Sequence, residues 1–200
     1  FADLQVSVFD GTLGFNVGNA AEAVSQGLEL DGRVGLSENW ILSAGVAFLD
    51  FEFLDHQNGT CVQGGIPDNP NGINCDYSGF TNQYVADYSG NILLAYETPL
   101  FDSLMFRANF DVVFTDDYFP SQNFDERIKQ DGNQVYNARF SLSDLGGDWD
   151  VALLGKNLSD ELIIVYGADA PTAYTITEAA THHGFVSPPR TVALQVSYRW

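Results

Sequence analysis

Apolar and polar residues alternate along most of this chain, and the alternation is most regular in its last ten residues. Every second residue of 191–200 is apolar: Val192, Leu194, Val196, Tyr198 and Trp200. The intervening residues are polar or small. A period of two is typical of a β-strand that has one apolar face and one polar face. The pattern therefore predicts a strand over 191–200 that finishes on an aromatic residue.

The same period of two recurs upstream and predicts seven further strands. We expect them over 1–9, 15–36, 40–50, 88–96, 103–115, 136–143 and from Trp149 toward Tyr166. The clearest is 103–115, where Phe106 and Phe110 alternate with Arg107 and Asp111; Met105 and Val113 are exceptions. Strands of about a dozen residues exceed the usual length of about 5–6 in globular proteins.

The connections between these strands alternate strictly between short and long. Short turns are predicted at 37–39, 99–102 and 145–148, and long connections at 55–85, 119–131 and 167–184; Asp10-Gly11 is a further turn signal. Outer-membrane barrels have short periplasmic turns and long extracellular loops. We therefore predict an all-β fold, an antiparallel up-and-down transmembrane β-barrel of which about eight strands are present. A secreted soluble β-sandwich that acts as a binding module is the alternative from another class.

The net charge of the chain excludes one class of binding partner. The chain has 27 acidic and 8 basic residues, a net charge of −19, and is therefore a poor partner for nucleic acid. No apolar run is long enough for a transmembrane helix, which needs about 18 such residues. Many acidic residues lie in the long connections, where they oppose anionic ligands or gather cations. They are Asp116, Asp117, Asp125, Glu126, Asp169 and Glu178.

The two cysteines, Cys61 and Cys75, lie in one connection rich in glycine, proline and asparagine. A close, even pair predicts a disulfide and an oxidising compartment, with two free thiols as the alternative. A bridge that closes about 15 residues stabilises by roughly 3 kcal/mol in the chain-entropy model. The stretch does not have EF-hand spacing, so it predicts no calcium site.

Three stretches resemble the TonB-dependent outer-membrane receptors. They are Asn19-Ala20 followed by Gly27-Leu28-Glu29-Leu30, then Lys156-Asn157-Leu158-Ser159-Asp160-Glu161, and finally Pro189-Arg190-Thr191 leading to Trp200. Each motif is weak alone, but all three occur in the order and on the strands that the family has. The family usually finishes on Phe, so Trp200 is a departure.

The resemblance implies a barrel of 22 strands whose lumen is closed by a separate N-terminal plug domain. Residues 1–200 are then expected to be the C-terminal part of the barrel, without the plug and the earlier strands. Such receptors lie in the bacterial outer membrane, in contact with its lipid. They bind scarce ligands outside, such as iron–siderophore complexes, vitamin B12 or oligosaccharides, and import them with energy delivered through the TonB complex. A passive channel on the same architecture is the alternative, and no enzyme, cofactor or metal is expected.

The candidate site residues are the charges expected on the lumen face. They are Glu29, Asp31, Arg33, Glu97, Arg107, Asp111, Arg139, Lys156 and Arg199. As a set they are expected to contact the plug, although any single one is more simply part of a solvated wall.

The long connections offer weaker candidates. Phe119-Pro120 and Phe124 are candidate aromatic contacts for a ligand. His182-His183 with Glu178 is a candidate metal site, although adjacent histidines in a loop are more often ordinary polar residues. No spacing ties Ser159-Asp160 to His182 as a catalytic set would require.

Overall fold

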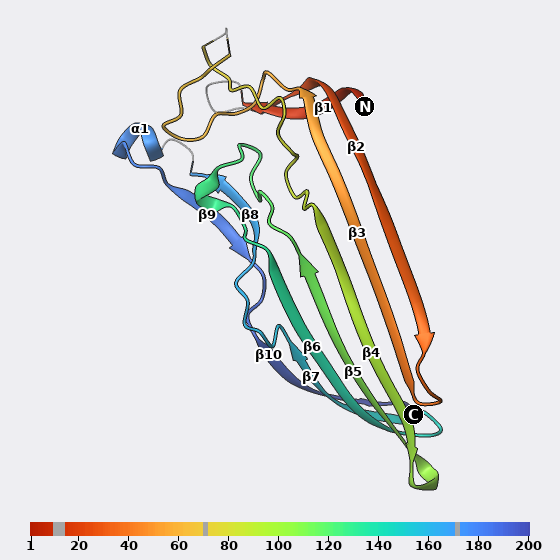
Figure 1. Cartoon of the computed structure of the whole chain (residues 1–200). Coiled ribbons are helices and arrows are strands. Elements are labelled where there is room, and N and C mark those ends of the chain that lie inside the picture. Colours follow the sequence, from red (N-terminus) through yellow and green to blue (C-terminus); the bar gives the residue numbers. More distant parts are fainter. Residues whose placement is uncertain (10–14, 70–71, 171–172) are drawn as a thin grey trace.

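Eight strands pair into one antiparallel sheet (Figure 1) in a computed structural model that describes residues 1–9, 15–69, 72–170 and 173–200. In spatial order they are β1 (Ala2–Phe9), β2 (Phe15–Gly35), β3 (Trp40–Asp55), β4 (Tyr88–Leu100), β5 (Leu104–Thr115), β6 (Asn133–Asp144), β7 (Trp149–Lys156) and β10 (Thr191–Tyr198). Strands that follow one another in the sequence are neighbours as far as β7, so the sheet is an up-and-down meander with β1 and β10 at its edges. The predicted all-β antiparallel fold is confirmed.

The connection between β7 and β10 differs from the prediction. It contains a two-stranded sheet of β8 (Ile164–Asp169) and β9 (His182–Val186), together with the short helix α1 (Ala173–Thr177). The strand that begins at Trp149 therefore stops at Lys156 and does not run toward Tyr166. The cause is Asn157, whose φ of 49° turns the backbone out of the extended conformation.

Two further expectations concern a membrane-spanning helix and the first turn of the chain. No helix among the described residues is long and apolar enough to cross a membrane. The predicted turn at Asp10-Gly11 lies outside the described residues.

The register of the sheet assigns side chains to two faces, because residues directly opposite each other in antiparallel strands point to the same side. One row of paired residues crosses seven strands and is wholly apolar: Val34, Leu42, Leu94, Phe110, Ala138, Gly155 and Val192. We call this side the outer face. Many of its large side chains are exposed, with Val192 at 65% and Leu194 at 71%. The opposite side, the inner face, carries rows such as Arg33 and Ser43, which pair across β2 and β3.

Aromatic rings gather at both ends of the outer face. Near the short turns, Tyr96 lies 4.6 Å from Trp40 and 6.3 Å from Phe106 between ring centroids. Near the long connections, Tyr88 lies 6.5 Å from Phe114. Tyr88 and Tyr96 both lie on β4 and are eight residues apart, which is about 26 Å along a strand. This spacing is comparable to the apolar band of about 25 Å between aromatic girdles in outer-membrane barrels.

The apolar core lies at one end of the sheet and not along its length. Its buried members are Ala23, Phe53, Tyr77, Phe119 and Phe124. Ala23 and Phe53 face each other across β2 and β3 on the inner face. The inner face is therefore apolar at this end, where the long connections cover it.

Candidate functional site

Three long connections, 56–87, 116–132 and 157–190, lie at the same end of the sheet, while the short turns lie at the other (Figure 1). Hydrogen bonds join them across large distances in sequence. Gln63 Nε2 donates to the carbonyl of Ala170 at 2.8 Å, and Gln83 Nε2 donates to the carbonyl of Pro120 at 2.9 Å. The three connections therefore form one body, which we call the loop cluster.

An aromatic core holds the loop cluster to the end of β3. The Tyr77 ring meets the Phe124 ring edge to face at 4.8 Å, and Phe124 meets Phe119 in the same way at 5.6 Å. The Tyr77 hydroxyl lies within hydrogen-bond distance of the carbonyl oxygens of Thr60 and Asn123, at 2.8 and 2.9 Å. Burial raises the pKa of Tyr77. Tyr77 thus packs and hydrogen-bonds at the centre of the cluster.

The disulfide between Cys61 and Cys75 stiffens the first connection, and its presence confirms the prediction. Gly59 and Cys75 exchange two backbone hydrogen bonds of 3.0 and 2.9 Å beside it. A side chain at Gly59 would begin 2.1 Å from the Tyr77 ring, so only glycine lets the strand pass that ring. The bridge closes a loop of separation 14, which is worth about 3 kcal/mol in the chain-entropy model.

A group of ionisable side chains, which we call the clasp, joins the second and third connections; its members are Asp125, Arg127, Asp169 and His182. The Asp125 side chain is 3% exposed and accepts hydrogen bonds from Arg127 Nε and Nη2. His182 Nε2 lies 2.8 Å from the same carboxylate. Burial opposes the charge of Asp125, but these hydrogen bonds outweigh it and lower its pKa to about 2. Asp169 lies 3.4 Å from the same nitrogen of His182, and burial together with the charge of Asp125 raises the pKa of Asp169.

Three members of the clasp, Asp125, Asp169 and His182, are the group in the described part of the chain that has metal-ligand spacing. It contains His182, as the weak metal candidate proposed, but with Asp125 and Asp169 in place of Glu178. Arg127 already neutralises Asp125 through two hydrogen bonds. The clasp is therefore best described as an ion-pair network that fastens two loops.

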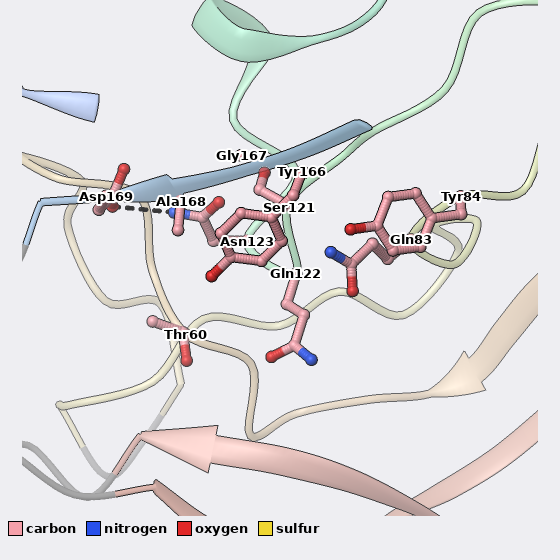
Figure 2. A pocket seen from close by; sticks show the side chains of 10 residues that line it. All are labelled: Thr60, Gln83, Tyr84, Ser121, Gln122, Asn123, Tyr166, Gly167, Ala168 and Asp169. Atoms are coloured by element: carbon pink, nitrogen blue, oxygen red, sulfur yellow. Dashed lines mark hydrogen bonds between the residues drawn. The ribbon is translucent and has the colours of Figure 1, made fainter. Parts of the chain in front are cut away.

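Two adjacent cavities open within the loop cluster. The first, the loop cavity, has a volume of about 380 Å³, and its polar lining side chains come from all three connections (Figure 2). They are Thr60, Gln83, Tyr84, Ser121, Gln122, Asn123, Tyr166 and Asp169. The second, the side cavity, has about 280 Å³ and shares Thr60, Gln83 and Gln122 with the first. Volumes of this order are at or near the lower end of the range for ligand sites.

A third hollow continues from the loop cavity onto the sheet. This wall hollow has about 520 Å³ and shares Tyr84 with the loop cavity. Inner-face residues of β2 to β5 line it, among them Ser25, Glu29 and Thr115. The three hollows therefore follow one another from the loop cluster to the inner face.

Eight of the nine predicted lumen charges lie on strands of the sheet, and all eight belong to the inner face; Arg199 lies beyond the end of β10. On β2 to β6 the inner-face residues have odd numbers. On β7 they have even numbers, because Arg139 pairs with Leu154, and Lys156 therefore belongs to the inner face as well. Arg107 pairs with Glu97 at 2.7 Å, and Arg139 pairs with Asp150 at 2.9 Å.

The remaining predicted charges are distributed along the wall and do not form one centre. Asp111 accepts a hydrogen bond from Asn137, and Glu29 lines the wall hollow. Asp31, Arg33 and Arg199 lie on exposed stretches of β2 and after β10. The structure shows where these side chains lie, while their contact with a plug domain stays a prediction.

The motif at 157–161 closes the start of the third connection onto the start of β10. Asn157 is buried, and its amide donates to the carbonyls of Glu161 at 2.9 Å and Pro188 at 3.2 Å. Asp160 accepts two hydrogen bonds from Arg190, from the backbone at 3.0 Å and the guanidinium at 2.9 Å. These bonds lower the pKa of Asp160.

The neighbouring motif residues have simpler positions. Leu158 lies over Gly155, where a Cβ would come within 2.8 Å of its side chain. Trp200 is fully exposed after β10. The motif thus has a structural explanation, since it fixes the turn that precedes the last strand.

Sequence reasoning missed most residues of the cavities. Gln83, Gln122 and Tyr166 belong to no motif, and they come together only because the three connections fold onto one another. The ligand candidates Phe119 and Phe124 are buried in the aromatic core, where they hold the loops, although Phe124 also lines the side cavity. The available signal was the length of the three connections, because long ordered loops are usually functional.

Comparison with known proteins gives a match of fold and not of sequence. Neither a protein-family model nor a curated protein matches the sequence. The ferric yersiniabactin uptake receptor FyuA from Yersinia pestis aligns with 90% of this chain and 24% of its own length, at a TM-score of 0.64 and 15% identity. The siderophore receptor PiuA from Acinetobacter baumannii aligns with 97% of this chain and 24% of its own, at 0.64 and 19% identity. The chain shares the fold of about a quarter of each of these β-barrel receptors.

A third solved structure agrees with this. BauA, the ferric preacinetobactin receptor from Acinetobacter baumannii, aligns with 97% of this chain and 25% of its own, at a TM-score of 0.58 and 16% identity. The chain thus spans about a quarter of the length of these receptors. This shared fold confirms the antiparallel β fold that the resemblance to TonB-dependent receptors implied.

Proposed function

We propose that this chain forms the C-terminal part of the barrel of a TonB-dependent outer-membrane receptor that imports a ligand of the siderophore type. The observation that carries the proposal is the fold shared with siderophore receptors, combined with a loop cluster that encloses polar cavities at one end. The disulfide in the first connection fits an oxidising compartment outside the cytoplasm.

The two faces of the sheet support the membrane location. The outer face is apolar and carries exposed large side chains on each of β2 to β7 and on β10, and aromatic rings mark both of its ends. Lipid is the environment that such a face requires. The inner face carries the charged residues, and we propose that they meet water and the plug domain that the family places in the lumen.

The first experiment tests topology in the full-length receptor. Single cysteines are placed on the outer face at Phe106, Phe110, Leu194 and Val196, and on the inner face at Arg107, Asn109, Gln195 and Ser197. We expect a lipid-soluble quencher to reach a label on the outer set and a water-soluble thiol reagent to reach the inner set. Equal access of the aqueous reagent to both sets would reject the membrane location and favour the soluble sandwich.

The second experiment tests transport. The full-length receptor is produced in a bacterial strain with a functional TonB complex and in one without it, and both receive radioactive iron bound to yersiniabactin, preacinetobactin or a trihydroxamate. We expect uptake of at least one chelate that disappears without TonB. Equal uptake in both strains would show a passive channel, and no uptake of any chelate would reject a siderophore-type ligand.

A further inference from the structure

The charged side chains that line the three hollows are of one sign. Among their described lining residues, Asp169 in the loop cavity and Glu29 in the wall hollow are acidic, and no lysine or arginine takes part. Among these lining residues, His56 is the side chain that could carry a positive charge. Burial lowers the pKa of His56, which favours its neutral form. A ligand that enters these hollows therefore meets negative and neutral groups.

The basic residues of the loop cluster are already paired. Arg127 is bound to Asp125, Lys129 to Asp117 and Arg190 to Asp160. The connection 56–87 contains three acidic residues, 116–132 contains five and 157–190 contains four, against only these three lysines and arginines. The excess of carboxylates gives the cluster a negative potential, which attracts cations and repels anions.

Several buried polar atoms at the cavities have no hydrogen-bond partner within the described residues. They include Ser121 Oγ and Asn123 Oδ1 in the loop cavity and His56 Nδ1 in the side cavity. The exposed fractions of these residues are only 2%, 6% and 6%. A buried polar atom that is left unpaired costs about 1–3 kcal/mol, so a ligand that pairs with it recovers that energy.

Most of the unpaired atoms are hydrogen-bond acceptors, so a ligand must supply donors to pair with them. Asn123 uses its amide nitrogen to donate to Asp169 Oδ2 at 2.9 Å (Figure 2), which leaves its amide oxygen as an acceptor. Asp169 Oδ1 is also buried and accepts no hydrogen bond, although His182 Nε2 lies 3.4 Å from it. Gln83 donates to Pro120, so the free end of that amide is an acceptor as well. A ligand that carries N–H, O–H or ammonium groups complements this set.

The geometry points to the chemistry of the ligand: the loop cavity and its neighbours select a ferric chelate that is positively charged or neutral and carries N–H or O–H donors, and they disfavour an anionic chelate. This inference rests on the proposed function, because it names the class of ligand that the receptor takes. The rings of Tyr84 and Tyr166 at the loop cavity are partly exposed, at 49% and 38%, and their faces also attract cations.

A set of probes that differ only in charge tests the inference on the purified full-length receptor. Ferrioxamine B carries a protonated amine and is positive, its N-acetyl derivative is neutral, and its N-succinyl derivative is negative. We expect equilibrium binding to weaken in that order, with about a tenfold difference or more between the positive and negative forms, since a unit charge near a partly buried carboxylate is worth at least that much. Equal or tighter binding of the N-succinyl form, or no binding of ferrioxamine B, would overturn the inference.

Variants at Gln122 show whether the cavities set this order. The Gln122 side chain is exposed, yet it lines both the loop cavity and the side cavity, so a substitution there leaves the buried core in place. Gln122→Lys should weaken ferrioxamine B and strengthen the N-succinyl form, each by about tenfold before screening by salt, and Gln122→Glu should do the reverse. The matched control is Ile66→Lys, which adds the same charge to the loop cluster at a side chain that is 88% exposed and lines none of the three hollows.

The outcomes separate this inference from the proposed function. If Ile66→Lys changes binding as much as Gln122→Lys does, the selectivity does not arise in the cavities and the inference falls. TonB-dependent uptake of an anionic ferric catecholate in preference to the trihydroxamates would overturn the inference and leave the transport function standing. Uptake of no ferric chelate would reject the proposed function itself.

Discussion

The sheet and the loop cluster are built on opposite principles. Strand residues such as Leu28 and Leu194 are 56% and 71% exposed, whereas Tyr77, Phe119 and Phe124 in the connections are at most 8% exposed. In most proteins the elements form the core and the loops lie on the surface. Here the loops contain most of the apolar core. The strands depend on what surrounds the sheet, and the loop cluster carries its own stabilising interactions.

This difference explains why the candidate site lies in the loops. A ligand site needs side chains held in fixed positions, and the aromatic core, the disulfide and the clasp supply that rigidity. The inner face offers charges without a comparable framework. Ion pairs such as Arg107 with Glu97 are about half exposed there, and exposed pairs contribute little.

The largest effect is expected when the core of the loop cluster is opened. Phe124→Ala removes a ring that packs against Tyr77 and Phe119, and deletion of a buried phenylalanine costs about 3–5 kcal/mol. Hydrogen exchange of the full-length receptor should then accelerate in 56–87 and 116–132 but not in β4 to β6. Phe110→Ala on the outer face is the control and should leave loop exchange unchanged. Equal acceleration in loops and strands would show that the two regions are not independent.

A smaller loss of stability is expected when the pH is lowered until Asp125 in the clasp is protonated. The pKa of Asp125 is lowered to about 2 in the folded chain, against an ordinary value near 4. A lowered carboxyl pKa gives stability that is present above about pH 4 and is lost as the pH falls toward 2, here up to about 2 kcal/mol. The pKa of Asp169 is shifted upward, so its protonation has the opposite sign and reduces the net loss.

Pepsin susceptibility of the loop cluster measures this titration. Cleavage within 116–132 should rise as the pH falls from about 4 to about 2. In Asp125→Asn, the neutral side chain removes that dependence and cleavage is high throughout. Glu126→Gln, at an exposed neighbour, should behave as the wild type does. An unchanged pH profile in Asp125→Asn would mean that the clasp does not hold the loops.

The smallest effect is expected on the inner face. Glu97→Gln breaks the ion pair with Arg107, whose side chains are 53% and 41% exposed, and should cost at most about 1 kcal/mol in the free energy of unfolding. Urea unfolding of the receptor in detergent gives this value. Asp31→Asn is the comparison, because no ion pair of Asp31 is found among the described residues. A cost of Glu97→Gln near that of Phe124→Ala would contradict the division between the two regions.

Local pattern was enough to predict the sheet but not the loop cluster. The strands β5 and β10 follow from a period of two, since each residue's face is decided by its own parity. The disulfide followed from the close spacing of Cys61 and Cys75. The strand from Trp149 was predicted too long because Leu162 to Val165 is an apolar run, and parity does not show that the side chain of Asn157 closes a turn before it.

The candidate site depends on contacts between distant segments. His182 and Asp125 are separated by 57 residues, and Gln63 and Ala170 by 107. No periodicity within one connection encodes such pairs, because each loop acquires its shape only against the other two. Sequence reasoning could therefore name the acidic loops and their preference for cations but not the cavities that they form.

The two edge strands have a consequence for assembly. Among the described strands, β1 and β10 each have a neighbour on one side only, and in water the amide and carbonyl groups on the other side are hydrated. In hydrocarbon each such group costs several kcal/mol, because nothing there can hydrogen-bond it. A sheet with two free edges therefore cannot enter a bilayer by stages, strand after strand. Such a sheet is compatible with hydrocarbon only together with strands that pair with both of its edges.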